Sequence, residues 1–224
     1  MFVVGDSVVN GGVMTDHKDL ATTVLTEQMK IQVCNVSAGS WGPGNYAAYF
    51  SKFKNLVSSN DVLVLVVNSH DLWEDDPAKT KGANVGKDIA LPMRKPFCAL
   101  FDGFYRYFIP VVRKKLGQAV VMTKVDVPKW QIDSKNELAL YNLSMLSKVF
   151  DISWKRKYML IHRSRKEMIS NVITSGECAF REYAKRNGIA IIELLLCEED
   201  YRDAIHLSVS GQRKMAEAIW KALE

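Results

Sequence analysis

The sequence predicts an α/β protein in which a central, mostly parallel sheet lies between two layers of helices. Short apolar runs alternate along the chain with longer segments in which apolar residues recur at helical spacing. Residues 62–67 are apolar without interruption, which is typical of a strand covered on both faces. Strands that alternate with helices in this way indicate a parallel sheet. The 224 residues fit a single domain that spans 1–224.

The elements follow one another in a regular order. The predicted strands cover residues 2–4, 31–36, 62–67, 158–161 and 189–195. The predicted helices cover residues 19–30, 45–57, 134–149, 174–187 and 210–223. Asn187 and Gly188 are typical of a helix end, and Ser208 or Ser210 is typical of a helix start.

Polar residues follow three of the predicted strands. Ser7, Gly39 and His70 each come shortly after an apolar run. In open parallel sheets, ligands bind beyond the carboxyl ends of the strands. We therefore expect one edge of the sheet to collect these three residues.

Ser7 is the candidate nucleophile, because Gly5-Asp6-Ser7 forms the turn after the first strand. A serine hydroxyl is a poor nucleophile near neutral pH and needs a base beside it. His206 is the candidate base, and Asp203 is the candidate group that fixes the imidazole tautomer. A separation of three residues suits a tight turn with both side chains on one face.

The chain order Ser, Asp, His differs from the orders of the chymotrypsin and subtilisin triads. The flanks of Ser7 also do not read Gly-x-Ser-x-Gly, so a nucleophile elbow of the α/β-hydrolase type is not expected.

Four separated blocks carry a resemblance to a known family. In chain order they read Gly5-Asp6-Ser7, Asn35-Val36-Ser37-Ala38-Gly39, Asn68-Ser69-His70-Asp71 and Asp203-Ala204-Ile205-His206. The chain resembles the SGNH hydrolases, also called the GDSL esterase/lipase superfamily. This resemblance implies a three-layer, flavodoxin-like fold and an esterase that needs no cofactor. It also implies that the backbone N–H groups of Ser7 and Gly39 bind the oxyanion.

The third block departs from the family pattern Gly-x-Asn-Asp, in which the asparagine amide donates to the oxyanion. Aligned on Asp71, the asparagine position holds His70 and the glycine position holds Asn68. A neutral His70 has one ring N–H to donate, and Asn68 has an amide. We favour His70 on register, with Asn68 as the alternative.

Three further regions carry expectations. We expect residues 72–150 to contain an insertion or lid at the rim of the site, although their aromatic residues would also suit a satellite core. The basic stretch 155–166 is read as a solvated rim, with a patch for an anionic substrate as the alternative. We expect Asp6 and Asp71 to brace their loops. We expect His162 and His17 at the surface, although His162 at a strand end would also suit a substrate site.

Composition excludes several classes of protein. The net charge of +5 is modest, and no nucleic-acid-binding module is recognised, so binding to nucleic acid is not expected. No apolar run approaches the ~20 residues of a membrane span. No signal-peptide pattern is present, so we expect a cytoplasmic protein, unless a trimmed N-terminus leaves secretion open. The four cysteines lack Cys-x-x-Cys spacing and are expected to be reduced and mostly buried. Asp75, Asp76 and His70 lack metal-ligand spacing, so no metal is expected.

The sequence therefore predicts a serine esterase that acts on a short acyl ester, such as an O-acetyl group on a carbohydrate. Two alternatives stay open. One is an acyltransferase that passes the acyl group to a sugar hydroxyl. The other is a non-catalytic binding module, which the unusual third block favours. The oligomeric state is left open.

Overall fold

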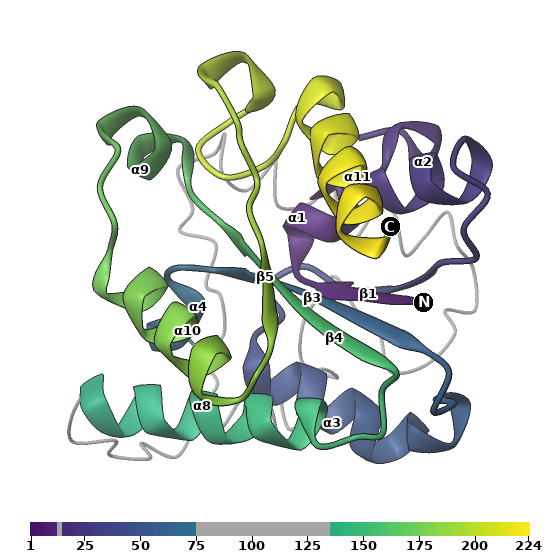
Figure 1. Cartoon of the computed structure of the whole chain (residues 1–224). Coiled ribbons are helices and arrows are strands. Elements are labelled where there is room, and N and C mark those ends of the chain that lie inside the picture. Colours follow the sequence, from purple (N-terminus) through teal and green to yellow (C-terminus); the bar gives the residue numbers. More distant parts are fainter. Residues whose placement is uncertain (13–14, 75–134) are drawn as a thin grey trace, which may run out of the picture. The chain divides into compact units, whose positions relative to one another are not determined.

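Parallel strands form one sheet in the order β2-β1-β3-β4-β5 (Figure 1). The structure is a computed structural model and describes residues 1–12, 15–74 and 135–224. The strands are β1 (Phe2–Gly5), β2 (Cys34–Ser37), β3 (Val62–Asn68), β4 (Arg156–His162) and β5 (Ala190–Ile192). This order is flavodoxin-like, and it changes direction between β1 and β3, where such folds bind ligands. The predicted fold class is confirmed.

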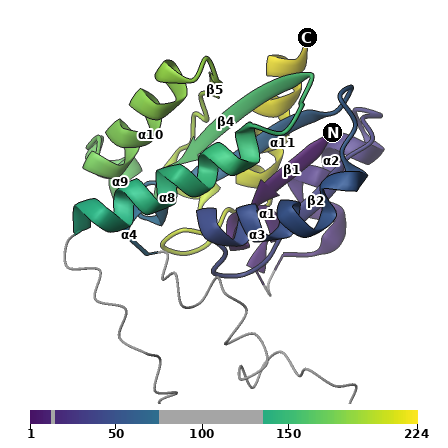
Figure 2. The same ribbon diagram turned by 90° about the horizontal axis from the view of Figure 1, so that it is seen from below.

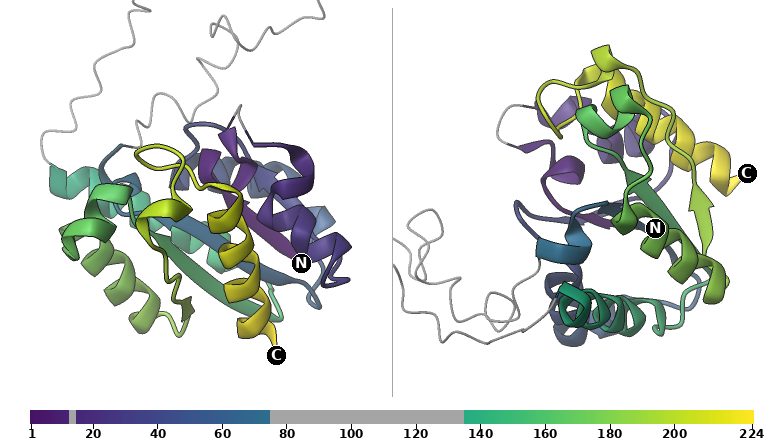
Figure 3. Two further views of the ribbon diagram at one scale, coloured as in Figure 1. Left: turned by 90° about the horizontal axis from the view of Figure 1, so that it is seen from above. Right: turned by 90° about the vertical axis from the view of Figure 1, so that its left-hand side faces the viewer.

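Two layers of helices cover the sheet. One face carries α3 (Pro43–Phe53), α4 (Asp71–Glu74), α8 (Lys135–Phe150) and α10 (Ser175–Arg186). Figure 2 shows α3 and α8 running side by side across it. The other face carries α1 (Ser7–Asn10), α2 (Ala21–Glu27) and α11 (Val209–Leu223), and Figure 3 shows α11 in yellow on that side. Short 3-10 turns lie at His17–Asp19, Lys54–Leu56 and Glu198–Asp200.

The strand β3 shows why the sheet is buried on both faces. Leu63, Leu65 and Val67 pack into the core beneath α3 and α8. Val64 and Val66 point to the opposite face and pack beneath α2 and α11. Side chains of a strand alternate between its two faces, so an uninterrupted apolar run supplies both cores.

The pairing of β3 with β4 brings two polar side chains together. Its register runs from Val62 opposite Arg156 to Asn68 opposite His162. Asn68 and His162 are thus the last residues of adjacent strands and lie at the carboxyl edge of the sheet. His162 is fully buried, so its expected surface position is wrong.

Several predicted boundaries need correction. The strand expected at 189–195 ends at Ile192, and Leu195 beyond it is exposed. The strand expected at 31–36 begins only at Cys34, because the chain at Ile31 still bonds back to the helix through Leu25. The helix expected at 134–149 is α8. Most of the insertion expected within 72–150 lies outside the described residues.

Two short helices lie where the sequence suggests a turn and a solvated rim. Asp6 starts α1 by accepting a hydrogen bond from the Val8 N–H. Ser164 starts α9 (Arg165–Ser170) in a capping box, a Ser-x-x-Glu pattern completed by Glu167. The Ser-x-x-Glu pattern is present in the sequence, but the surrounding basic residues favoured the interpretation as a solvated rim.

Other expectations concern exposure. The described cysteines are free and exposed rather than buried, because they lie on the outer rim of β2, on α10 and after β5. His17 is exposed, as predicted. Within the described residues, every helix is too short or too polar to cross a membrane.

Candidate active site

Ser7 and His206 meet at the carboxyl edge of the sheet, although 199 positions separate them. The Ser7 hydroxyl lies 2.9 Å from Nε2 of His206. On the other side of the ring, Nδ1 lies 2.8 Å from Oδ2 of Asp203 and 3.1 Å from Oδ1. The arrangement is a continuous hydrogen-bonded chain from hydroxyl to imidazole to carboxylate, which is the geometry of an activated serine.

Residues 203–206 form a tight turn that local hydrogen bonds stabilise. The Oδ1 of Asp203 accepts hydrogen bonds from the N–H groups of Ile205, at 3.0 Å, and His206, at 2.8 Å. Burial raises the pKa of Asp203, but these N–H groups and the His206 ring outweigh it and lower the pKa to about 2. The carboxylate is therefore ionised at neutral pH and accepts the Nδ1–H of His206.

Arg202 ties this segment to the chain that follows α1. Its guanidinium donates to Oγ1 of Thr15 at 2.7 Å and to the Gly11 carbonyl at 3.3 Å. Beside it, Gly12 has a φ of +61°, and a Cβ at that position would lie 3.5 Å from Nε2 of His206. A Cβ would thus make an ordinary van der Waals contact with the ring, and the positive φ is what favours glycine at this position.

A buried polar network lies beneath Ser7. Asp6 accepts hydrogen bonds from the Val8 N–H and from Nδ2 of Asn68, both at 2.8 Å. The Oδ1 of Asn68 lies 2.7 Å from Nδ1 of His162. Asp71 accepts the backbone N–H of Asn68 at 2.8 Å. Asp6 and Asp71 therefore brace their loops, as the sequence predicts.

Asn68 and His70 occupy different environments. Asn68 is 1% exposed, and its amide binds Asp6 and His162. The His70 side chain is 33% exposed and borders an open groove. His70 is therefore the more accessible of the two candidate oxyanion donors.

Gly39 lies just beyond β2, the strand next to β1. Ser37, at the end of β2, is opposite Gly5 in the register. Gly39 and Ser7 each follow that pair by two residues, so both reach the same edge of the sheet. Gly39 is exposed in a turn that the Trp41 N–H closes onto the Ala38 carbonyl at 3.3 Å.

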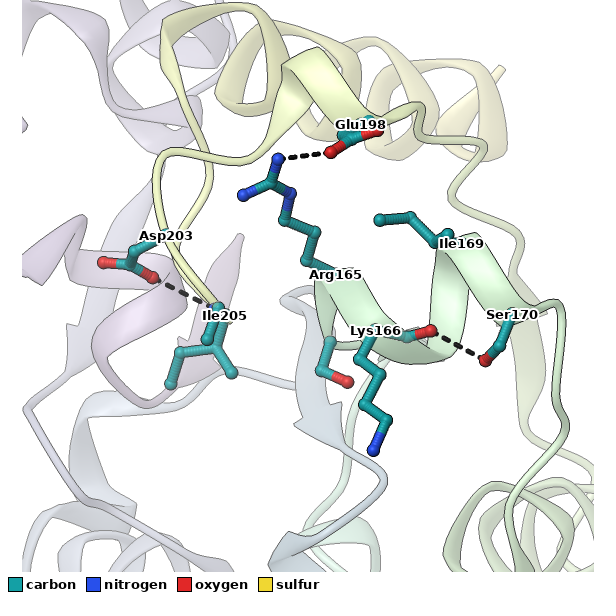
Figure 4. Close-up of a pocket in the computed structure, with 9 residues that line it drawn as sticks. Arg165, Lys166, Ile169, Ser170, Glu198, Asp203 and Ile205 are labelled. Carbon is teal, nitrogen blue, oxygen red and sulfur yellow. Dashed lines mark hydrogen bonds and ion pairs between the residues drawn. The ribbon is translucent and has the colours of Figure 1, made fainter.

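Two grooves border the segment that carries His206. One, of about 710 Å³, lies between α9 and residues 203–205 (Figure 4). Figure 4 shows Arg165 extending toward Glu198, its ion-pair partner, while Lys166 extends away from that pair. The other groove, of about 840 Å³, shares Lys166 and Ile205 with the first and reaches His70.

Comparison with known proteins reveals relatives at the level of structure. No protein-family model and no curated protein matches the sequence. TesA matches with a TM-score of 0.56 and 13% identity, over 100% of this chain and 97% of its own. LAE5, an alpha/beta hydrolase enzyme from the metagenome of Lake Arreo in Spain, matches with a TM-score of 0.55 and 13% identity. The match covers 99% of this chain and 93% of LAE5. A member of the lipolytic protein G-D-S-L family from Veillonella parvula matches with a TM-score of 0.51 and 11% identity. The match covers 98% of this chain and 95% of that protein.

The chain has the SGNH hydrolase fold. At 11–13% identity the likeness concerns the fold, and it agrees with the strand order and with the resemblance of the four sequence blocks.

The SGNH fold brings most of the predicted site residues to one edge. Ser7, Asp203 and His206 are in direct contact. Gly39 follows β2 and His70 follows β3, the strands on either side of β1, and Asn68 lies below the surface. Within the described residues, no group of three or more His, Cys, Asp or Glu side chains is placed to hold a metal ion. The absence of a metal or cofactor stays a prediction.

Two residues at this edge were not recognised from the sequence, and a third, His162, was expected at the surface with a substrate site as the alternative. Arg202 precedes Asp203 without any motif of its own, and Gly12 belongs to an unremarkable Gly-Gly pair. His162 ends an apolar strand, where a lone polar residue at the last position was the available signal.

Proposed function

We propose that the chain is a serine esterase in which Ser7 is the nucleophile, His206 the base and Asp203 the group that orients the base. The observation that carries this proposal is the contact of the Ser7 hydroxyl with His206, which Asp203 holds from the other side. The SGNH fold supports it, because this fold is shared with a lipolytic G-D-S-L protein.

The geometry supports a two-step reaction. The Ser7 oxygen attacks the ester carbonyl carbon while its proton passes to Nε2 of His206. When the tetrahedral intermediate collapses, the bond to the alcohol oxygen breaks and His206 returns the proton to that oxygen. A water molecule, deprotonated by His206, then attacks the acyl-enzyme, and the acid leaves as Ser7 regains its proton.

Three donors are proposed for the oxyanion. Ser7 is the first residue of α1, and the first N–H groups of a helix have no partner within it. Gly39 supplies a second N–H from the turn that follows β2. His70 supplies the third, since the amide of Asn68 is buried and engaged with Asp6 and His162.

The proposed substrate is a short acyl ester, with O-acetyl groups on carbohydrates as the first class to assay. The resemblance to the SGNH hydrolases implies this chemistry. The grooves beside Ile205 are open enough for a substrate larger than the ester group itself.

Covalent labelling tests the nucleophile. A fluorophosphonate probe should modify the wild-type chain at Ser7, identified by mass spectrometry of the labelled peptide. Ser7→Ala should abolish both labelling and hydrolysis across a panel of acyl esters and acetylated sugars. Ser51→Ala, a change of an exposed serine on α3, is the matched control. An unlabelled wild-type chain, or a Ser7→Ala variant with a tenth of the activity, overturns the proposal.

The oxyanion donors have their own test. Gly39→Pro removes the N–H. Type II turns favour proline directly before a residue of positive φ, and Ser40 has a φ of +58°. It should lower kcat by roughly 10²–10³-fold, whereas Gly39→Ala keeps the N–H and should be mild. His70→Ala should lower kcat in the same range with KM little changed, and His70→Asn should recover part of the loss. If Asn68 is the donor instead, His70→Ala will be mild.

Product analysis separates hydrolysis from transfer. Reactions that contain a sugar acceptor should release free acid as the main product. Accumulation of acylated acceptor would assign the chain to the acyltransferases.

A further inference from the structure

His162 has no part in the proposed reaction, yet it is fully buried at the edge that carries the site. It is the last residue of β4 and lies opposite Asn68, the last residue of β3. Burying a polar ring in a packed core is costly unless its nitrogens find partners. Its contacts therefore call for a functional explanation.

The hydrogen bonds around His162 fix which nitrogen carries the proton. Asp6 accepts from Asn68, so the amide NH₂ of Asn68 faces Asp6 and its oxygen faces His162. An oxygen can only accept here, and the ring must therefore donate from Nδ1. The result is a directed chain of donors from His162 through Asn68 to Asp6.

The environment of the other ring nitrogen favours a neutral His162 in this arrangement. Nε2 is buried and has no hydrogen-bond partner among the described residues. A second proton on Nε2 would place an unpaired charge in the core. Burial accordingly lowers the pKa of His162 to about 3. His162 therefore does not compete with His206 as a base.

His162 also contacts the segment that holds His206. Its ring packs against the ring of Tyr201, with centroids 5.7 Å apart. The Tyr201 hydroxyl donates to the Arg163 carbonyl at 2.6 Å, and the Tyr201 backbone pairs with Leu207. Tyr201 and Leu207 stand at the two ends of the segment that contains Asp203 and His206.

We propose that His162 is a positioning residue that sets the distance between the Ser7 hydroxyl and the His206 ring. On one side His162 acts through Asn68 and Asp6. Asp6 is the N-cap of α1, the helix whose first residue is Ser7. On the other side His162 acts through Tyr201, which closes the His206 segment. This inference rests on the proposed esterase function, since it needs Ser7 and His206 to react together.

Three substitutions separate the donated hydrogen bond from the volume of the ring. His162→Asn places an amide N–H at the same number of bonds from Cβ as Nδ1, so it can still donate to Asn68. His162→Gln places that group one bond further out, and His162→Leu removes it. His162→Asn should keep kcat within about 3-fold of wild type. The other two should lower kcat by roughly 10-fold to 100-fold with KM nearly unchanged, because displaced reacting groups slow the chemical step.

The readouts distinguish this inference from the proposed function. Circular dichroism and thermal melts identify the folded variants, and the Asn/Gln pair keeps the test decisive if His162→Leu does not fold. The rate of fluorophosphonate labelling at Ser7 should follow kcat across the series. Equal rates in wild type, His162→Asn and His162→Gln overturn the positioning role while the labelled wild type upholds the esterase. Equal losses in His162→Asn and His162→Gln also overturn it.

The tautomer gives an independent check that needs no turnover. Nitrogen NMR of the wild-type protein should show the His162 proton on Nδ1 at neutral pH. A proton on Nε2 would reverse the direction of the chain to Asn68 and overturn the proposal.

Discussion

Ser7 and His206 face each other, but different kinds of contact hold them. Beneath Ser7 lie Asp6, Asn68 and His162, which are at most 5% exposed and come from three different strands or strand ends. His206 sits in a short segment whose internal hydrogen bonds span two to four residues and whose Asp203 side chain is 47% exposed, while Arg202 and Ala204 add bonds to more distant parts of the chain. The proposed nucleophile is thus supported from the core, while the proposed base is carried by a surface turn.

This difference separates activity from stability. A change in the surface turn disturbs the imidazole but removes few buried contacts. A change beneath Ser7 leaves buried polar groups without partners, which costs far more free energy. Substitutions in the surface turn should therefore lower mainly activity, whereas substitutions beneath Ser7 should lower both stability and activity.

The largest effect on activity is expected from Asp203→Asn. An amide can still accept the backbone N–H groups, but it favours the wrong imidazole tautomer. The variant should lower kcat by roughly 10⁴-fold and lower the free energy of unfolding by only about 0.5–1.5 kcal/mol, because the amide oxygen still accepts the backbone N–H groups. Glu199→Gln, a nearby exposed carboxylate, is the control for charge. A kcat within 10-fold of wild type would mean that another group holds His206.

The next effect concerns the buried side. Asn68→Ala leaves Asp6 and His162 without their shared partner, and each buried unpaired group costs on the order of 1–3 kcal/mol. The free energy of unfolding, measured in urea, should fall by about 2–5 kcal/mol, together with a loss of kcat of roughly 10-fold to 100-fold. Asn60→Ala changes an exposed asparagine and should leave both quantities unchanged. A stable Asn68→Ala variant would show that the network does not support the fold.

The same contrast explains what the sequence could predict. The Asp203–His206 turn is readable because its contacts are local, so the spacing of the two residues carries the geometry. The Asp6–Asn68–His162 network joins residues that are 62 and 94 positions apart. Only the register of β3 against β4 shows that Asn68 and His162 meet, and no spacing in the chain reports that register.

The fold itself was largely readable for a related reason. Strands such as β3 are apolar runs, and helices such as α11 repeat apolar residues at helical spacing. Both kinds of element can therefore be predicted from the local sequence. The errors lie where tertiary contacts decide, as at the short β5, or where side chains cap short helices, as at α1 and α9.

A smaller effect is expected where the two regions approach each other. Gly12→Asn keeps a residue that tolerates positive φ, but its side chain would begin 3.5 Å from Nε2 of His206. It should lower kcat/KM by about 10-fold, since a crowded base is displaced from its partner. Gly188→Asn is the matched control, because Gly188 has a φ of +62° and open space around its Cβ position. Equal kcat/KM in the two variants would show that Gly12 does not shape the site.

The last effect is a slope of stability against pH, and it sharpens the description of the buried side. The pKa of His162 is about 3 in the folded chain and near its ordinary 6.5 when unfolded. Between these values the unfolded chain binds a proton that the folded chain does not. The free energy of unfolding should therefore fall as the pH drops from 6.5 toward 3, by up to about 1.4 kcal/mol per pH unit, and this contribution should be constant above 6.5. His162→Asn should remove that part of the slope, whereas His17→Asn, at an exposed position, should keep it. Urea titrations of the three proteins at several pH values measure the difference, and parallel slopes in all three would mean that His162 is protonated in the folded core.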